Sequence, residues 1–157
     1  MPRILLALAL CVACKKSPPA AARFCDQDLT GIWFNSSDTS FAYRFRDHGE
    51  VIRGEFLERQ ADGGLQAPDD PILFELHRTD GGLGGVMRAQ GASASGRICP
   101  VEYGTSISDC KPDALQVVVE TSVQVDDECK RKRLPDGGEM QPNLSEFRFE
   151  RAPDGGR

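Results

Sequence analysis

Apolar and polar residues alternate with a period of two along most of the chain, and the alternation is clearest between Ser40 and Arg46. In that stretch aromatic residues occupy every second position, and alanine and arginine occupy the positions between them. Successive side chains of a β-strand point to opposite faces, so the pattern predicts a strand with one buried face. The aromatic residues expected on the buried face are Phe41, Tyr43 and Phe45.

Other segments show the same alternation or a short apolar run, and turns rich in Gly, Asp, Asn and Pro separate them. No stretch of ten or more residues has a convincing helical period. The eight predicted strands span residues 28–34, 40–46, 51–59, 71–78, 83–90, 97–105, 115–125 and 146–151. The strand at 115–125 is the strongest, with one face made of Val117, Val119, Val123 and Val125.

This order of strands predicts an all-β, antiparallel fold in which neighbours in sequence pair. Closing the meander into an up-and-down barrel leaves no exposed edge, and eight strands enclose an interior just wide enough for side chains or one small ligand. A two-sheet β-sandwich is the alternative. The expected interior, and therefore the candidate ligand-binding surface, consists of Trp33, Phe41, Tyr43, Phe45, Phe56, Phe74, Phe147 and Phe149.

The N-terminus forms a separate segment. Arg3 precedes an apolar run at residues 4–10, and small residues follow as far as Cys14. This layout is typical of a secretory signal peptide and is too short for a permanent transmembrane helix. An ordinary secretory leader and an apolar start of a cytosolic protein are the alternatives.

The segment Cys11-Val12-Ala13-Cys14 resembles the lipobox of bacterial lipoproteins, in which the cysteine is acylated and becomes the new N-terminus. The resemblance implies lipidation of Cys14, so that acyl chains such as palmitate anchor the protein to a membrane of the cell envelope. Aspartate after this cysteine holds many lipoproteins at the inner membrane; Lys15 implies the outer membrane instead. The expected division is a signal peptide at 1–13, a lipidated N-terminus and flexible tether at 14–24, a β-barrel domain at 25–151 and a disordered tail at 152–157.

Gly31-Ile32-Trp33, on the first predicted strand, resembles the Gly-x-Trp signature that opens lipocalin-like (calycin-type) barrels. In that superfamily the tryptophan packs across the base of the barrel, often beneath an arginine from near the last strand. The resemblance therefore implies a lipocalin-like barrel in which Arg148 or Arg151 lies over the ring of Trp33.

Charge limits the possible partners. The chain of 157 residues has 19 Lys and Arg against 24 Asp and Glu, and removal of residues 1–13 takes away only Arg3, which leaves a net charge of −6. An acidic protein is a poor match for nucleic acid, whose phosphates attract a basic face. The acidic balance also indicates that membrane attachment depends on the acyl chains.

Cysteine usage agrees with export. Cys11 leaves with the leader and Cys14 is acylated, and the remaining even number predicts two disulfides with three possible pairings. Strands that alternate in direction place partners at the same end of a barrel, which favours Cys25–Cys110 and Cys99–Cys129. If residues 97–105 do not form a full strand, a local Cys99–Cys110 bridge that leaves Cys25–Cys129 is the better pairing.

The sequence contains no Gly-x-Ser-x-Gly elbow and no His-Glu-x-x-His helix. His48 and His77 lie in a turn and on an outward face, so we expect no enzyme activity, no cofactor and no metal site. Two functions remain for a monomer anchored in the envelope. One is a lipocalin-like binding module for a small hydrophobic ligand such as an envelope lipid. The alternative is a solid barrel with a structural or inhibitor-like, protein-interaction role through loops at 61–70 and 126–145. The basic run at 130–133 is a candidate surface for anionic headgroups or an acidic partner.

Overall fold

The computed structural model describes residues 24–153, and these contain nine β-strands and no α-helix. Alternating apolar positions place one face of each long strand in a common interior. The strands are β1 (Gly31–Asn35), β2 (Asp38–Asp47), β3 (Val51–Arg59), β4 (Leu65–Gln66), β5 (Leu73–Thr79), β6 (Gly82–Ala92), β7 (Ile98–Cys110), β8 (Ala114–Thr121) and β9 (Asn143–Arg151).

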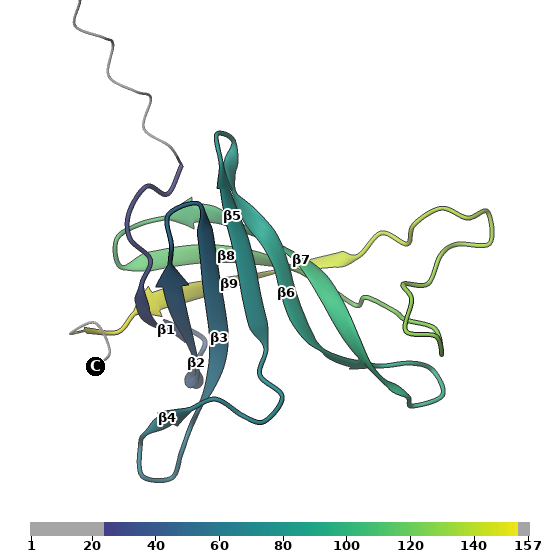
Figure 1. Ribbon diagram of the computed structural model, residues 1–157, viewed down its shortest axis with the longest axis horizontal. Coiled ribbons are helices and arrows are strands. Elements are labelled where there is room, and N and C mark those ends of the chain that lie inside the picture. The colour runs from purple at the N-terminus through teal and green to yellow at the C-terminus, as the bar shows by residue number, and fades with distance from the viewer. Residues whose placement is uncertain (1–23, 154–157) are drawn as a thin grey trace, which may run out of the picture.

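Eight of these strands close into an antiparallel up-and-down barrel (Figure 1). Sequential neighbours pair from β1 to β9, and β9 returns to pair with β1 through Phe34 and Glu150. The extra strand β4 only adds a short pairing to the end of β3, so that β3 pairs directly with β5. The barrel prediction is confirmed, and the β-sandwich alternative is not the fold of this chain.

The boundaries differ from the prediction around β7 and β8. The segment expected at 97–105 continues to Cys110, and the segment expected at 115–125 ends at Thr121. Ser122 has a φ of 61°, which is incompatible with an extended strand. Val125 is therefore not a β8 residue; it is buried in a separate small cluster with Cys99 and Val101.

The predicted limits of the domain are slightly too narrow. Phe24, assigned to the tether, packs against the barrel core. Ala152, assigned to the tail, is buried, and its N–H donates to the carbonyl of Ile32 at 2.8 Å. The lipidation prediction at Cys14 and the rest of the tail at 154–157 lie outside the described residues.

A second, smaller apolar cluster lies on the outside of the barrel. Ile32, Ala42 and Leu57 point outward and are nonetheless buried, because Leu65 and Ala67 of the β4 segment pack over them. The loop at 61–70 is thus partly committed to covering the barrel wall.

Candidate functional site

Six of the eight predicted ligand-binding residues belong to the main core cluster of the barrel or pack against it. The main core cluster is continuous and includes fully or nearly fully buried side chains from all eight barrel strands. Within this interior the ring of Tyr43 on β2 links strands that are not paired with β2, because it contacts Phe74 on β5 and Phe149 on β9. The members from the barrel strands are Trp33, Phe45, Ile52, Phe74, Leu76, Leu83, Ile107, Leu115, Val117, Val119 and Phe149.

Aromatic rings occupy the middle of this interior. The ring of Tyr43 stacks on Phe149 with centroids 4.6 Å apart, and it contacts Phe74 edge-on at 5.3 Å. Below it, the Phe45 ring lies so close to the backbone of β3 that a Cβ at Gly54 would stand 2.4 Å from a ring carbon. Glycine at that position is what lets the ring lie across the interior.

Three of the predicted interior residues are less enclosed than expected. Tyr43 and Phe147 are only half-buried, although both pack against the core. Phe41 is 42% exposed and lies at the open end of the barrel, where its ring contacts Phe56 at 5.5 Å. Period-two alternation identified the correct face of the strand for Phe41. The side chain is nevertheless exposed, because this residue lies near the start of β2, at the end of the barrel.

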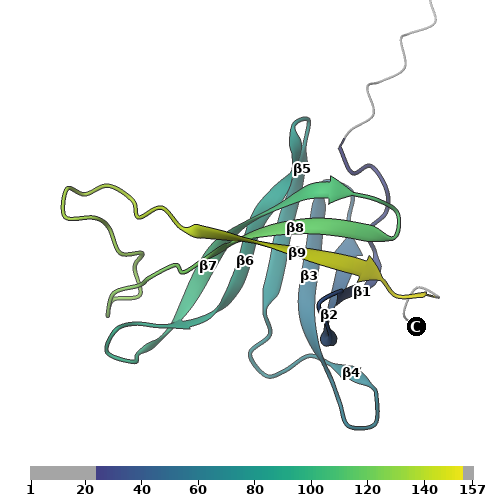
Figure 2. The same cartoon turned by 180° about the vertical axis from the view of Figure 1, so that it is seen from behind.

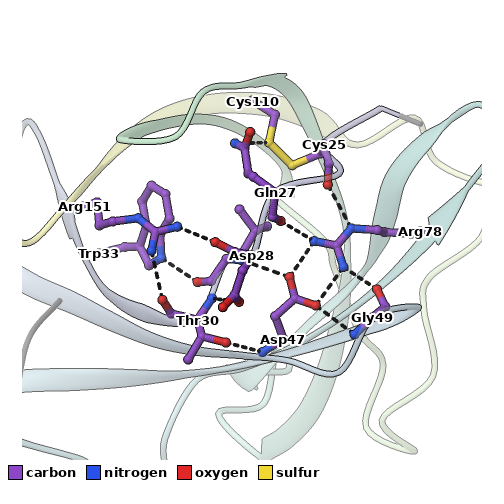
Figure 3. Close-up of polar contacts among 11 residues, drawn as sticks. Cys25, Gln27, Asp28, Thr30, Trp33, Asp47, Gly49, Arg78, Cys110 and Arg151 are labelled. Atoms are coloured by element: carbon purple, nitrogen blue, oxygen red, sulfur yellow. Dashed lines mark hydrogen bonds and ion pairs between the residues drawn. A yellow bond between two sulfur atoms is a disulfide. The ribbon is translucent and has the colours of Figure 1, made fainter. Parts of the chain in front are cut away.

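Trp33 and Arg151 close the base of the barrel, as the Gly-x-Trp resemblance implied (Figure 3). The guanidinium carbon of Arg151 lies 4.5 Å from the centroid of the Trp33 ring, and the indole N–H donates to the carbonyl of Leu29 at 2.9 Å. Arg151 also donates to the carbonyls of Asp28 and Thr30 at 2.6 and 3.0 Å. The cation comes from Arg151; Arg148 instead pairs with Glu150.

A buried ion pair beside this base fixes the N-terminal segment (Figure 3). Arg78 and Asp47 have side chains only 7% and 5% exposed, and a guanidinium nitrogen lies 2.5 Å from a carboxylate oxygen. Arg78 also donates to the carbonyls of Cys25 and Gln27 at 2.9 and 2.8 Å. Sequence alternation gives no hint of this role, because Arg78 lies at the end of a strand where an exposed charge is the usual expectation.

The carboxylate of Asp47 is held ionised by its donors. Burial alone would raise the pKa of Asp47, but hydrogen bonds from Arg78 and from the amides of Leu29 and Gly49 lower that pKa below its ordinary value. The Cys25–Cys110 disulfide ties the same N-terminal segment to the end of β7, and Gln27 donates to the sulfur of Cys110 at 2.9 Å. This pairing confirms the prediction. The ion pair and the disulfide therefore hold the N-terminal segment against the closed end of the barrel.

The connection at 122–142, which we call the β8–β9 loop, lies at the opposite end of the barrel (Figure 2). The predicted Cys99–Cys129 disulfide is present and joins the loop to the start of β7. Arg131 pairs with Glu120 on the outer wall at 2.5 Å, and the same Glu120 oxygen accepts the N–H of Gly104 at 2.9 Å. These anchors hold a long polar loop in a defined position.

The β8–β9 loop carries most of its positive charge unpaired. Its basic run borders a cavity of about 680 Å³ together with Asp126, Glu139 and Met140. Asp126 is occupied within the loop, since its carboxylate accepts the N–H groups of Glu128 and Lys130. Within residues 24–153, no carboxylate forms an ion pair with Lys130, Lys132 or Arg133. Lys130, Lys132 and Arg133 therefore lie beside the open end without an ion pair in the described residues, although Lys132 is close enough to Asp127 for their charges to interact.

Sequence reasoning missed a second charged surface, on the outer wall of the barrel. Arginines that are scattered in sequence come together there because β2, β3, β5 and β6 are neighbours in the sheet. They border a groove of about 260 Å³, and its charged residues are Arg44, Arg46, Arg53, Arg88, Glu55 and Glu75. The alternation in the sequence indicates that these residues point outward. Which of them become neighbours on adjacent strands depends on strand register.

Between residues 24 and 153 no group of three or more His, Cys, Asp or Glu side chains is arranged to hold a metal ion. In the same part of the chain no helix is long and apolar enough to cross a bilayer. His48 is exposed, and the imidazole of His77 lies 3.6 Å from Glu75 on the outer wall.

No protein-family model, no curated protein and no solved structure matches the chain.

Proposed function

We propose that this protein is a lipid-anchored envelope protein with a solid barrel, which binds an acidic partner protein through its β8–β9 loop. The lipobox resemblance at Cys14 supports the anchor, and the outer membrane follows from Lys15. The proposal takes the second of the two functions that the sequence suggested, and one observation carries it: side chains from all eight barrel strands meet in one core cluster.

The filled interior argues against a carrier. A small-molecule site ordinarily encloses several hundred cubic ångströms, about 300–1,000 Å³, among apolar side chains. Here the stacked rings of Tyr43 and Phe149 occupy the region where such a ligand would lie. Binding therefore falls to the outside of the molecule, where anchored loops on a rigid scaffold commonly carry function.

The β8–β9 loop has the properties of a protein-binding surface. It combines the three unpaired cations with exposed apolar side chains at Leu134 and Met140, and Leu144 at the start of β9 is 67% exposed. Interfaces favour such a mixture of arginine, methionine and apolar contact, and complementary charge speeds association. The partner surface that suits it is acidic with an apolar centre.

The barrel geometry also orients this loop. The described chain begins at the closed end, where Cys25 is bonded to Cys110, and the β8–β9 loop projects from the open end (Figures 1 and 2). A tether from Cys14 to Phe24 reaches at most about 35 Å when fully extended. Anchored in this way, the loop can face away from its own membrane toward proteins of the envelope.

Site-specific cross-linking tests this function. A photoreactive residue replaces Leu134 in the lipidated full chain, and cross-links are formed in intact envelopes. We expect one discrete adduct that is lost when Lys130, Lys132 and Arg133 are all changed to glutamine, because the partner then loses its complementary charges.

A matched control removes the same charge elsewhere, with Arg59, Lys111 and Arg148 changed to glutamine. That variant should retain the adduct. Absence of any adduct, or its equal loss in both triple variants, contradicts binding of an acidic partner through the loop.

A further inference from the structure

The groove on the outer wall has a surplus of positive charge that the protein itself does not neutralise. We call it the arginine groove, and it lies on the wall that faces the viewer in Figure 1, across β2, β3, β5 and β6. Four arginines border it but only two carboxylates do, in a chain whose net charge is −5. The proposed loop function does not use this surface.

Strand register brings two of these arginines directly opposite each other. Arg46 on β2 and Arg53 on β3 are paired residues of the sheet, and their side chains are 61% and 68% exposed. Like charges at directly opposed positions of an antiparallel pair destabilise it. The direct pairing of Arg46 with Arg53 is therefore unfavourable for the local stability of the sheet.

The carboxylates position the arginines without satisfying them. One oxygen of Glu55 accepts hydrogen bonds from both Arg44 and Arg46, at 2.9 and 3.3 Å. One oxygen of Glu75 lies 3.7 Å from Arg53 and 4.0 Å from Arg88. Each carboxylate is therefore shared between two guanidinium groups.

Most of the donors in the groove remain available. A guanidinium carries five N–H donors. In the described part of the chain the four arginines make three hydrogen bonds in all, two to Glu55 and one from Arg88 to Glu102 at 2.8 Å. The groove that these arginines line is built on four adjacent strands, which hold side chains more precisely than a loop does.

We propose that the arginine groove binds a phosphate-bearing anion. A phosphate group offers three or four oxygens and can accept from several guanidinium groups at once, whereas a single carboxylate offers two. The exposed side chain of Leu73, which is 42% exposed at the edge of the groove, adds apolar contact for whatever carries the phosphate. The source of the phosphate is a soluble phosphorylated compound or a lipid headgroup.

The test uses the full chain carrying Cys14→Ser, with inorganic pyrophosphate as the first probe and isothermal titration calorimetry as the readout. We expect saturable binding of one pyrophosphate per chain. Arg46→Gln and Arg53→Gln should each weaken it on the order of tenfold, the loss expected when one charge-assisted contact is removed. Arg148→Gln, on another wall, is the matched control and should leave binding unchanged.

Two further variants separate binding from a merely structural role. Glu55→Gln removes the carboxylate that competes for Arg44 and Arg46, so it should tighten pyrophosphate binding. Arg46→Gln should weaken binding without lowering the melting temperature, because it also relieves the repulsion from Arg53. Weaker binding by Glu55→Gln, or equal affinity of the arginine variants and the control, overturns the proposal.

Vesicles distinguish the two sources of phosphate. If phosphatidylglycerol vesicles bind the Cys14→Ser chain and pyrophosphate displaces it, with Arg53→Gln again weaker, the site takes lipid headgroups. If pyrophosphate binds and the vesicles do not, the site takes a soluble phosphate compound. Failure of both probes to bind refutes the proposal.

Discussion

At the scale of single residues, the closed end of the barrel depends most on Arg78. This one side chain pairs with the buried carboxylate of Asp47. It also donates to the backbone carbonyls of Cys25 and Gln27, which belong to the N-terminal segment that precedes β1 and forms no strand. Breaking a buried pair by removing one partner leaves the other charge without compensation. The carboxylate of Asp47 would then be buried and ionised with only the amides of Leu29 and Gly49 as donors.

Arg78→Met is expected to lower the free energy of unfolding by about 3–5 kcal/mol at pH 7. Urea denaturation measures it. Arg148→Met is the control: Arg148 and its partner Glu150 are each 54% exposed, and such a pair is worth at most about 1 kcal/mol. Equal losses from the two substitutions would contradict a special role for Arg78.

The Arg78–Asp47 pair also predicts how the difference in unfolding free energy between wild type and Arg78→Met changes with pH. A carboxylate whose pKa is lowered on folding contributes stability above its unfolded pKa, and this contribution is lost as the pH falls through the folded pKa. In Arg78→Met the Asp47 carboxylate instead opposes folding while it is ionised. The difference in unfolding free energy between wild type and Arg78→Met should therefore become smaller below about pH 4. A difference that does not change with pH would argue against the stabilisation of ionised Asp47 by Arg78.

At the scale of elements, one disulfide fixes the N-terminal segment and the other fixes the β8–β9 loop. Cys25–Cys110 connects the N-terminal segment to β7 across 85 positions of sequence, whereas Cys99–Cys129 spans 30 and holds the β8–β9 loop. The loop also has the Arg131–Glu120 pair and a bond from the side chain of Arg97 to the carbonyl of Asp127 at 2.7 Å. The barrel ladder does not depend on the loop.

The double substitution Cys99→Ala and Cys129→Ala should release the loop and leave the barrel folded. We expect limited trypsin digestion to cut first within residues 130–133 and at least tenfold faster than in wild type, because cleavage needs local opening. Mass spectrometry of the fragments locates the cuts, and circular dichroism confirms the β-structure. The double substitution Cys25→Ala and Cys110→Ala provides the comparison, since it should leave the loop as resistant as before. Equal cleavage of the loop in both variants would show that the disulfide does not fix it.

At the scale of the whole molecule, the proposed function rests on the continuous core cluster inside the barrel. Rings from β2, β5 and β9 meet through Tyr43, Phe74 and Phe149, and apolar side chains of the other walls complete the same cluster. A core packed at the density of an ordinary protein interior excludes ligands unless side chains are removed. The proposed binding surfaces consequently lie outside the barrel.

A hydrophobic fluorophore, N-phenyl-1-naphthylamine, tests this property. The wild-type chain should give no saturable fluorescence increase, whereas Tyr43→Ala should bind the dye, because apolar cavities left by truncation can accept small apolar ligands. Phe74→Ala serves if the first variant does not fold. Saturable binding of one dye molecule per wild-type chain would contradict a solid barrel and return the carrier function to first place.

Much of the fold could be predicted because alternation is a local property. Each of the eight barrel strands was identified from its own residues, and alternating strand direction then sorted four cysteines into the two observed pairs. The errors occurred where local pattern is a poor guide. Val123 and Val125 continue the alternation of β8, but the chain turns at Ser122. The two-residue strand β4 is too short to have a period.

The amino-acid pattern by itself thus determined the barrel strands and the face that each strand buries, because these depend on residue order along a strand. The cap of Trp33 by an arginine was implied by the Gly-x-Trp resemblance, and the structure selects Arg151. The tertiary structure alone decided whether the interior is filled and which charges become neighbours. Side-chain volumes meet only when opposite walls close, and Arg46 comes to oppose Arg53 only through strand register. The arginine groove belongs to this second class, whereas the basic run of the β8–β9 loop at 130–133 was visible in the sequence.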